Sequence, residues 1–160
     1  ESFLYVVDGE LSVRMMISSA ELTKGGYIYS PASNNITLKL RRGYIICIQR
    51  RYEPVAGHSA HTVVGNANDL EWMSYEGMEN CYVQDFLPSA RDIGFDMNMH
   101  ILKFHIGASH GYIETHVQQH GMYFLSGNLC TDLEMTGYRF RKVITASWSL
   151  CSTGLLRYRR

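Results

Sequence analysis

The sequence predicts an all-β protein. Its 160 residues include eleven Tyr and fourteen Gly but only three Pro. Short runs rich in β-branched and aromatic residues recur along the chain, and glycine-containing turns separate them. Such runs are typical of strands in a sandwich or barrel.

Composition narrows the range of functions. With 46% hydrophobic residues, the chain can bury the core of one ordinary domain or of two small ones. Fifteen basic residues balance fifteen acidic ones, so no net field attracts nucleic acid or an anionic membrane. No apolar run has the length of a membrane span, and no signal-peptide pattern is present. We therefore expect a small-molecule ligand, with no nucleic-acid or membrane partner.

The cysteines and the first residue bear on the cellular compartment of the protein. The four cysteines show no C-x-x-C spacing, so we interpret them as free thiols in a reducing compartment and expect a cytoplasmic protein. The chain starts without Met, inside a strand-like run. We expect that an N-terminal portion precedes it and that any targeting segment belongs to that portion. The cysteines are Cys47, Cys81, Cys130 and Cys151.

The first section, residues 1–54, reads as strands joined by turns. Apolar residues 3–7 form a first strand, Asp8-Gly9 supplies a hairpin-type turn, and Leu11 to Ile17 is the returning strand. Further strands are predicted at residues 27–29, before Pro31, and at residues 44–48.

Four arginines in this section have two interpretations. They could form a phosphate-binding patch, but no glycine-rich cradle lies near them and the chain has no excess of positive charge. A solvated face is the favoured interpretation. The residues are Arg41, Arg42, Arg50 and Arg51.

Turn and loop formers dominate residues 55–92, which we interpret as a linker between two sections. His58 and His61 in this linker could be a ligand pair, but exposed histidines are the favoured interpretation. The second section opens with the alternating run from Phe95 to Ile106, whose methionines are expected to pack in a core.

Metal-ligand residue types are concentrated between Gly107 and Gly127. Glu114, His116 and His120 stand at even spacings there, which on an extended strand places their side chains on one face. One carboxylate and two imidazoles suit a divalent ion such as manganese, iron, zinc or nickel, and three ligands leave positions open for water and substrate.

Other interpretations of these residues remain. A helix would also bring His116 and His120 together, although four glycines disfavour it. The histidines could instead be surface or core residues without an ion. Neighbouring His100 and His105 are expected to lie outside the ligand set, and His110 is expected in a loop.

The pattern at these residues resembles the first metal-binding motif of the cupins. Cupins usually show His, His and Glu in that order, whereas here the order is Glu114, His116, His120. This order, with DMNMHIL before it and HVQQHGMYFLSG after it, is similar to the C-terminal cupin of the (S)-ureidoglycine aminohydrolases, which are manganese-dependent bicupins. The resemblance runs from about Glu1 to Gly127 and is strongest to bacterial members.

The resemblance implies a fold and a domain organisation. The chain would be a fragment of a bicupin, built from double-stranded β-helix (jelly-roll) barrels. Residues 1–54 would be a partial N-terminal cupin without metal ligands, residues 55–92 the linker, and residues 93–127 the first half of the metal-binding C-terminal cupin.

Residues 128–160 depart from the family, so the second barrel would be incomplete. The family continues with a metal-binding Gln and, near the substrate, a Tyr and a Lys, but no Gln follows Gln119 here. In shifted reading frames, residues 136–145 and 152–157 can encode segments similar to the missing ones. A frameshift is therefore our hypothesis for this aberrant tail.

The resemblance also implies a reaction. The protein would hydrolyse (S)-ureidoglycine to (S)-ureidoglycolate and ammonia in allantoin and purine catabolism, with Mn²⁺ held by Glu114, His116 and His120. Glu114 would in addition accept a proton as a catalytic residue. A complete barrel would form a homo-oligomer. The alternatives are another metal cupin, such as an isomerase or dioxygenase, and a noncatalytic truncated cupin that at most binds metal.

Overall fold

The computed structural model describes residues 1–32, 34–75, 77–109, 121–133, 136–141 and 154–157. The chain divides into two compact units. Unit 1 comprises Glu1–Glu71 and Gln84–Ile101, and unit 2 comprises Trp72–Val83 and Leu102–Arg160. In the described residues, regular structure is strand except for one 3-10 turn, η1 (Ala67–Asp69). The predicted all-β class is confirmed.

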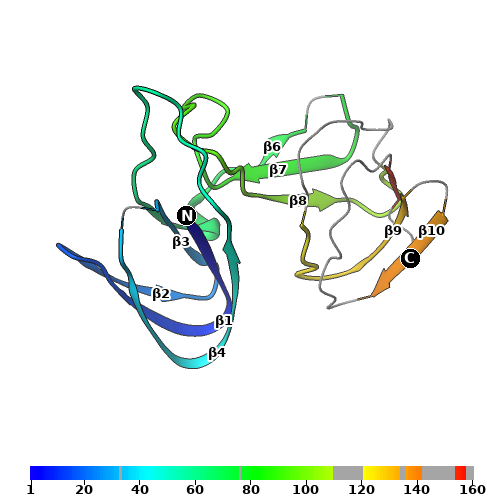
Figure 1. The fold of residues 1–160 in the computed structure, drawn as a ribbon. Helices are drawn as coiled ribbons and strands as arrows, with labels where there is room; N and C mark the ends of the chain where they lie inside the picture. The colour runs from blue at the N-terminus through cyan, green and yellow to red at the C-terminus, as the bar shows by residue number, and fades with distance from the viewer. Residues whose placement is uncertain (33, 76, 110–120, 134–135, 142–153, 158–160) are drawn as a thin grey trace. The chain divides into compact units, whose positions relative to one another are not determined.

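Unit 1 is built on a five-stranded antiparallel sheet. The long strand β1 pairs with β2 through its second half, with β3 through its first half and with β4 along its whole length, while β5 pairs with β3. Figure 1 shows β1, β2 and β4 curving together. The strands are β1 (Ser2–Arg14), β2 (Ser19–Thr23), β3 (Gly26–Ser30), β4 (Thr37–Gln49) and β5 (Val63–Asn66).

The predicted hairpin turn at Asp8-Gly9 is wrong, because β1 runs through it. Gly9 has a φ of 98° and lies opposite Gly43, whose φ is 86°. The register of β1 against β4 shifts on both sides of this pair, so the glycines lie between two β-bulges. A Cβ on Gly9 would come 1.9 Å from the carbonyl oxygen of Arg42. Glycine is needed here for close approach of two strands.

The chain reverses direction between Met15 and Ser18 rather than at Asp8-Gly9. The amide of Met15 donates to the carbonyl oxygen of Ser18 at 2.8 Å, which closes the turn between β1 and β2. Leu11 and Val13, expected on a returning strand, therefore belong to β1, and both are buried.

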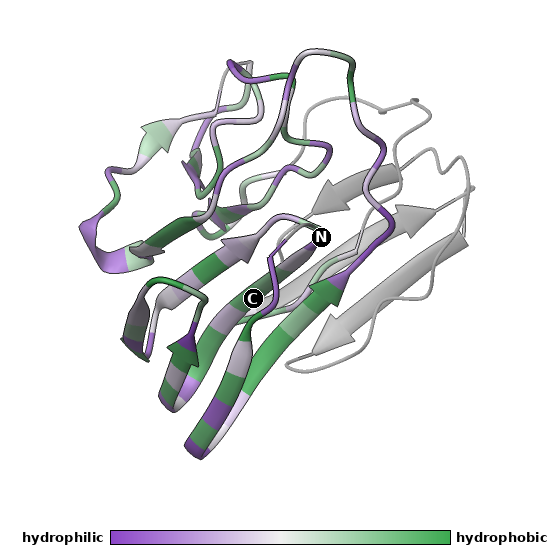
Figure 2. Ribbon diagram, turned by 60° about the vertical axis from the view of Figure 1, so that its left-hand side comes forward, coloured by the Kyte–Doolittle hydropathy of each residue, from purple (hydrophilic) through white to green (hydrophobic). Residues whose placement is uncertain are grey.

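Successive side chains of β1 point to opposite faces of the sheet, and apolar residues on each face contribute to a separate core. Figure 2 shows hydrophobic residues recurring along these strands. One core, called here the aromatic core, comprises Phe3, Tyr27, Tyr29, Ala67, Phe86, Leu87, Phe95 and Met97. The other, called the aliphatic core, comprises Leu4, Val6, Leu11, Val13, Leu22 and Ile28. Met97 is buried in the aromatic core and the partly buried Met99 packs against this core, so the prediction of core methionines is confirmed for both.

Residues 84–99 cover the aromatic core. The Phe86 ring lies 5.7 Å from Phe3 and 4.6 Å from Tyr27, measured between centroids. Aromatic pairs at such distances contribute about 0.5–1.5 kcal/mol each beyond the burial of their area. The buried amide of Gln84 donates to the carbonyl oxygens of Ala67 and Leu70, which fixes η1 to this segment.

The remaining strands form two three-stranded sheets. One has the order β6-β7-β8, with β6 (Met73–Ser74), β7 (Cys81–Asp85) and β8 (His100–Phe104). The other has the order β10-β9-β11, with β9 (Asn128–Leu133), β10 (Thr136–Arg141) and β11 (Gly154–Arg157). The second sheet is formed by residues of the stretch 128–160, for which we predict a departure from the family pattern. None of the described helices is long and apolar enough to cross a membrane.

Candidate functional site

The predicted metal ligands Glu114, His116 and His120 lie outside the described residues, as does His110. Among the residues that are described, no group of three or more His, Cys, Asp or Glu side chains could hold a metal ion. The candidate site is therefore characterised by the segments that lead into and out of it and by the chemistry of its donor set.

The segment that leads into the candidate site is fixed to unit 2 by its backbone. The amide of His105, just after β8, donates to the carbonyl oxygen of Asn80 at 2.9 Å. The amide of Ala108 donates back to the carbonyl oxygen of His105 at 3.0 Å, across a turn that contains Gly107 with a φ of 84°. Gly107 therefore marks a turn before the predicted ligands, and Ala108 is buried.

The segment that leads out of the site differs from the prediction. The extended strand considered for the ligands does not continue into residues 121–127, none of which is in a strand, and β9 begins at Asn128. Gly127 closes the segment with a φ of 84°. Four glycines between residues 107 and 127 disfavour a helix, and they also weaken a continuous strand.

The histidines nearest to the candidate ligands have other contacts. The ring of His105 is exposed and lies 5.2 Å from the ring of Tyr82. His100 opens β8 and is exposed. In the linker, His58 and His61 are exposed as predicted, and His61 packs edge-on against Phe95. None of these four belongs to a metal-binding group within the described part of the chain.

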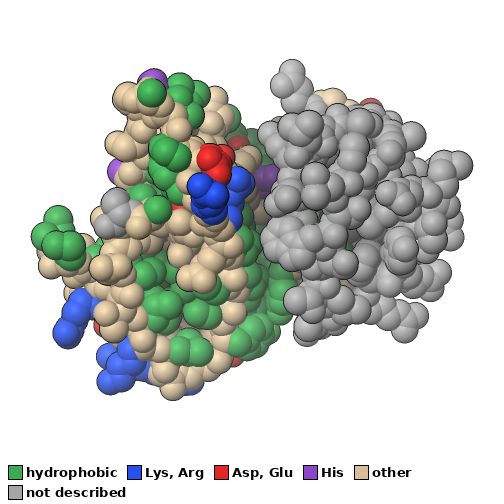
Figure 3. Space-filling model, in the orientation of Figure 1, with side chains coloured by type: hydrophobic (Ala, Val, Ile, Leu, Met, Phe, Trp, Pro, Cys, Tyr) green, Lys and Arg blue, Asp and Glu red, His purple; other side chains and the backbone are tan. Residues whose placement is uncertain are grey.

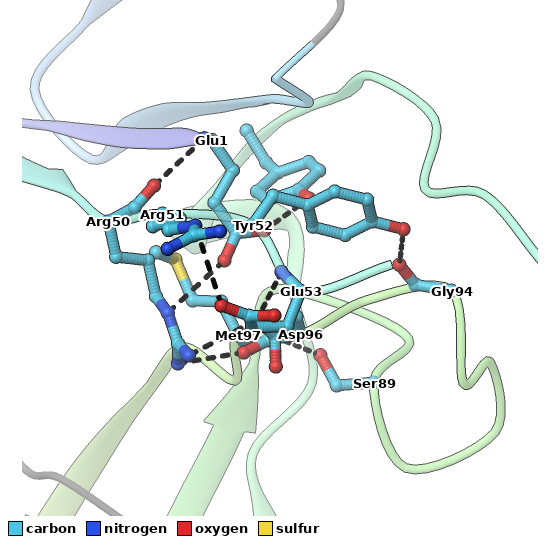
Figure 4. Close-up of polar contacts among 10 residues, drawn as sticks. Glu1, Arg50, Arg51, Tyr52, Glu53, Ser89, Gly94, Asp96 and Met97 are labelled. Atoms are coloured by element: carbon cyan, nitrogen blue, oxygen red, sulfur yellow. Dashed lines mark hydrogen bonds and ion pairs between the residues drawn. The ribbon is translucent and has the colours of Figure 1, made fainter. Parts of the chain in front are cut away.

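A polar network in unit 1 connects residues far apart in the sequence (Figure 4). The side chain of Glu1 is fully buried, and its carboxylate accepts a hydrogen bond of 2.6 Å from the hydroxyl of Tyr29. Arg50 Nε lies 3.5 Å from the same carboxylate. Arg50 also binds Asp96, with 3.1 Å between Nη2 and Oδ2 and a hydrogen bond of 2.9 Å to the carbonyl oxygen.

The contacts among Glu1, Tyr29, Arg50 and Asp96, called here the Glu1 network, hold several segments of unit 1 together. Burial, together with the hydrogen bond to Glu1, raises the pKa of Tyr29 far above its ordinary value, so Tyr29 remains a hydrogen-bond donor. Asp96 Oδ2 accepts a hydrogen bond of 3.0 Å from the amide of Glu53. The network thus ties the residue before β1, the end of β3 and the residues that follow β4 to Asp96. No local sequence pattern joins its members, so the network could not be predicted from the sequence.

The four arginines do not gather into an anion site. Arg42 pairs with Glu10 at 2.9 Å, and Arg41 lies 4.0 Å from Glu21. Arg50 belongs to the Glu1 network, and Arg51 pairs with Glu53 at 3.6 Å. All four are exposed, which confirms the prediction of a solvated face.

The chain is similar to known (S)-ureidoglycine aminohydrolases. It is 48% identical to the enzyme from Escherichia coli over 130 residues, which cover 79% of this chain and 49% of the relative. Identity to the enzyme from Arabidopsis thaliana is 27% over 129 residues, covering 79% of this chain and 42% of the relative. The chain thus spans about half the length of the curated relatives that it matches. No protein-family model matches it.

A solved structure supports the fold. The crystal structure of protein Ylba from E. coli, a DUF861 protein, superposes with a TM-score of 0.80 at 36% sequence identity. It covers 99% of this chain, while this chain covers 62% of it. The fold and the sequence agree: the chain has a cupin fold and, over most of its length, is similar to the (S)-ureidoglycine aminohydrolases.

Proposed function

We propose that this chain carries the metal half-site of a manganese-dependent (S)-ureidoglycine aminohydrolase. The observation that carries the proposal is the 48% identity to the E. coli enzyme over 79% of the chain. The reaction is hydrolytic: (S)-ureidoglycine and water give (S)-ureidoglycolate and ammonia, so a carbon–nitrogen bond is replaced by a carbon–oxygen bond.

The donor set of the candidate site fits a divalent metal. Carboxylate oxygen suits manganese, and imidazole nitrogen suits the later transition metals, so Glu114, His116 and His120 together accept several divalent ions. When bound, such a metal orients an amine and a carboxylate and stabilises the charge that develops as ammonia leaves. Among these ligands, Glu114 is also the residue proposed to accept a proton.

A noncatalytic role is the second candidate. It is favoured by residues 120–160, which contain no Gln, whereas the family resemblance implies a metal-binding Gln downstream of the three ligands. In that case the three ligands bind metal without turnover. The two candidates share the metal site and differ in whether ammonia is released.

Metal content tests the ligand assignment. The purified chain is loaded with Mn²⁺ and desalted, and the retained metal is measured by mass spectrometry for wild type, His116→Ala and His58→Ala. We expect His116→Ala to lose the metal, because two ligands hold a divalent ion far more weakly than three. His58→Ala, which changes an exposed histidine outside the set, retains it. Equal retention by wild type and His116→Ala removes His116 from the site.

A further inference from the structure

The contacts that bear on the candidate metal site lie in unit 2. Figure 3 shows hydrophobic side chains, Lys and Arg interspersed on one face of unit 1, whereas the sequence of unit 2 includes Glu114, His116 and His120. The last described strand before these three residues is β8, which pairs with β7. Because the chain is continuous, contacts that fix the end of β8 also fix the point from which residues 114–120, called here the ligand segment, are reached.

Asn80 is hydrogen-bonded to the residue that follows β8. Its carbonyl oxygen accepts a hydrogen bond of 2.9 Å from the amide of His105. Beyond the other end of β7 and β8, the amide of Phe86 donates to the carbonyl oxygen of Met99, also at 2.9 Å. The hydrogen bonds between the two strands thus extend one residue past each end. On the side of the ligand segment, the bond from His105 to Asn80 is the last that the structure describes between them.

Asn80 has a backbone conformation that few residue types adopt. Among the described residues other than glycine, Asn80 alone has a positive φ, of 58°. Asn adopts this left-handed conformation more readily than Ala and most other residues, which pay a steric cost there. Because the residue is exposed, its identity is best explained by its backbone conformation rather than by packing of its side chain.

The loop between β6 and β7 holds Asn80 in place. The amide of Tyr75 donates to the carbonyl oxygen of Cys81 at 2.9 Å, and the amide of Met78 donates to the carbonyl oxygen of Tyr75 at 3.1 Å. Met78 and Cys81, which precede and follow Asn80, are 7% and 1% exposed. The loop is therefore closed by its own hydrogen bonds and anchored by buried residues on both sides of Asn80, so the position of the Asn80 carbonyl group is fixed.

His105 connects this loop to the turn that precedes the ligand segment. Its carbonyl oxygen accepts a hydrogen bond from the amide of the buried Ala108. Its ring lies 5.2 Å from the ring of Tyr82, with 38° between the two planes. Asn80 therefore holds the backbone of His105, and Tyr82 holds its ring.

We propose that Asn80, together with Tyr82, positions the ligand segment for metal binding. The left-handed conformation of Asn80 directs its carbonyl group to His105, and this contact fixes the end of β8. The inference rests on the proposed function, because it takes Glu114, His116 and His120 as the ligands. Asn80 acts through His105, and no contact with metal or substrate is assigned to it. When the end of β8 shifts, a smaller fraction of molecules is competent to bind metal, and the apparent affinity falls with that fraction.

Affinity for Mn²⁺ tests the role of Asn80. Titration calorimetry gives the Kd of the purified full chain for Mn²⁺ in wild type, Asn80→Ala, Asn80→Gly and Gly77→Ala. We expect Asn80→Ala to bind about five- to thirtyfold more weakly, the factor that corresponds to the cost of the left-handed conformation for Ala. Asn80→Gly should restore the wild-type Kd, because glycine adopts positive φ freely.

Gly77→Ala is the matched control. Gly77 lies in the same loop with a φ of 77°, and a Cβ added there meets nothing within 4 Å. This substitution therefore strains the backbone of the loop without changing the residue that is bonded to His105. Urea unfolding is measured in parallel, and we expect both Ala variants to lose stability but only Asn80→Ala to lose affinity.

The outcomes distinguish this inference from the proposed function. A wild-type Kd in folded Asn80→Ala, or an equal loss of affinity in Gly77→Ala, overturns the positioning role and leaves the metal site in place. A wild type that binds no Mn²⁺ overturns the proposed metal site and this inference with it.

Tyr82→Leu tests the same contact to His105 if Asn80→Ala fails to fold. It removes a ring pair of a kind that corresponds to about a two- to tenfold change in an equilibrium constant, and we expect Mn²⁺ binding to weaken by about that factor. Trp72→Leu is its control: the Trp72 ring contacts only the flexible end of a β8 side chain, with Lys103 Nζ 5.2 Å from the ring centroid, so its loss should leave the Kd unchanged. Unchanged affinity in Tyr82→Leu, or an equal loss in Trp72→Leu, then overturns the proposal.

Discussion

Glu1 shows how the free-energy cost of burying a charged side chain can be offset by its neighbours. An ionised carboxylate loses several kcal/mol of hydration when it is buried, unless hydrogen bonds and a counter-charge replace that hydration. Tyr29 supplies the hydrogen bond and Arg50 the counter-charge. Among the described residues, none donates a hydrogen bond to the other carboxylate oxygen, Oε1, so the free energy of burying Glu1 depends on Tyr29 and Arg50.

Removal of the Tyr29 hydroxyl should therefore destabilise unit 1. Tyr29→Phe leaves a buried carboxylate oxygen without its donor, and we expect a loss of about 1–3 kcal/mol in the free energy of unfolding. Tyr44→Phe removes the same atom from a side chain that is 51% exposed and should change stability by less than about 0.5 kcal/mol. Urea titration measures both. Equal effects of the two substitutions would show that the hydrogen bond to Glu1 is not stabilising.

The raised pKa of Tyr29 gives this residue a pH signature. Below the ordinary tyrosine pKa of about 10, Tyr29 is protonated in both the folded and the unfolded chain. Above it, only the unfolded chain releases the proton, so stability falls as pH rises. Tyr29→Phe should lose this contribution and show a shallower decline, by up to about 1.4 kcal/mol per pH unit. Parallel profiles of wild type and variant would contradict the assignment.

At the residue scale, a site can be predicted from the sequence only where its residues form a local pattern. Glu114, His116 and His120 could be proposed as ligands because their types and even spacing carry the chemistry. The Glu1 network could not be predicted, because Glu1, Arg50 and Asp96 meet only after β1 and β4 have paired.

At the scale of elements, the same dipeptide can form either a hairpin turn or part of a β-bulge. Asp-Gly is a strong hairpin signal, and glycine with positive φ also fits a bulge. The choice depended on Gly43, which lies far along the chain and meets Gly9 only in the sheet. Strands 27–29 and 44–48 were predictable because they are apolar on both faces, and both are found within β3 and β4.

Gly43 and Gly57 allow the effect of close approach between strands to be compared with the effect of a strained backbone conformation alone. Gly43 and Gly57 both have positive φ, at 86° and 79°. A Cβ on Gly43 would lie 1.9 Å from the carbonyl oxygen of Asp8, whereas a Cβ on Gly57 meets nothing within 4 Å. Gly57→Ala should cost about 1–2 kcal/mol from its dihedral angles alone. Gly43→Ala should cost clearly more, since the two strands must separate. Chemical denaturation compares them, and similar losses would contradict the close-approach account.

At the scale of the whole molecule, the chain spans about half the length of the curated relatives that it matches. Unit 1 has two cores and a buried ionic network. The proposed metal ligands fall in the part of the sequence that belongs to unit 2, and no Gln follows Gln119 in it. Turnover by this chain is accordingly the most demanding test of the proposed function.

Ammonia release from freshly prepared (S)-ureidoglycine is the most direct measurement. The purified chain is assayed with Mn²⁺, with a chelator and as His116→Ala, each against the spontaneous rate. The proposed function predicts release above the spontaneous rate with Mn²⁺, and release at the spontaneous rate with chelator or with His116→Ala. Release that is no faster than the spontaneous rate with a chain that retains Mn²⁺ would contradict the hydrolase and leave a noncatalytic metal-binding cupin.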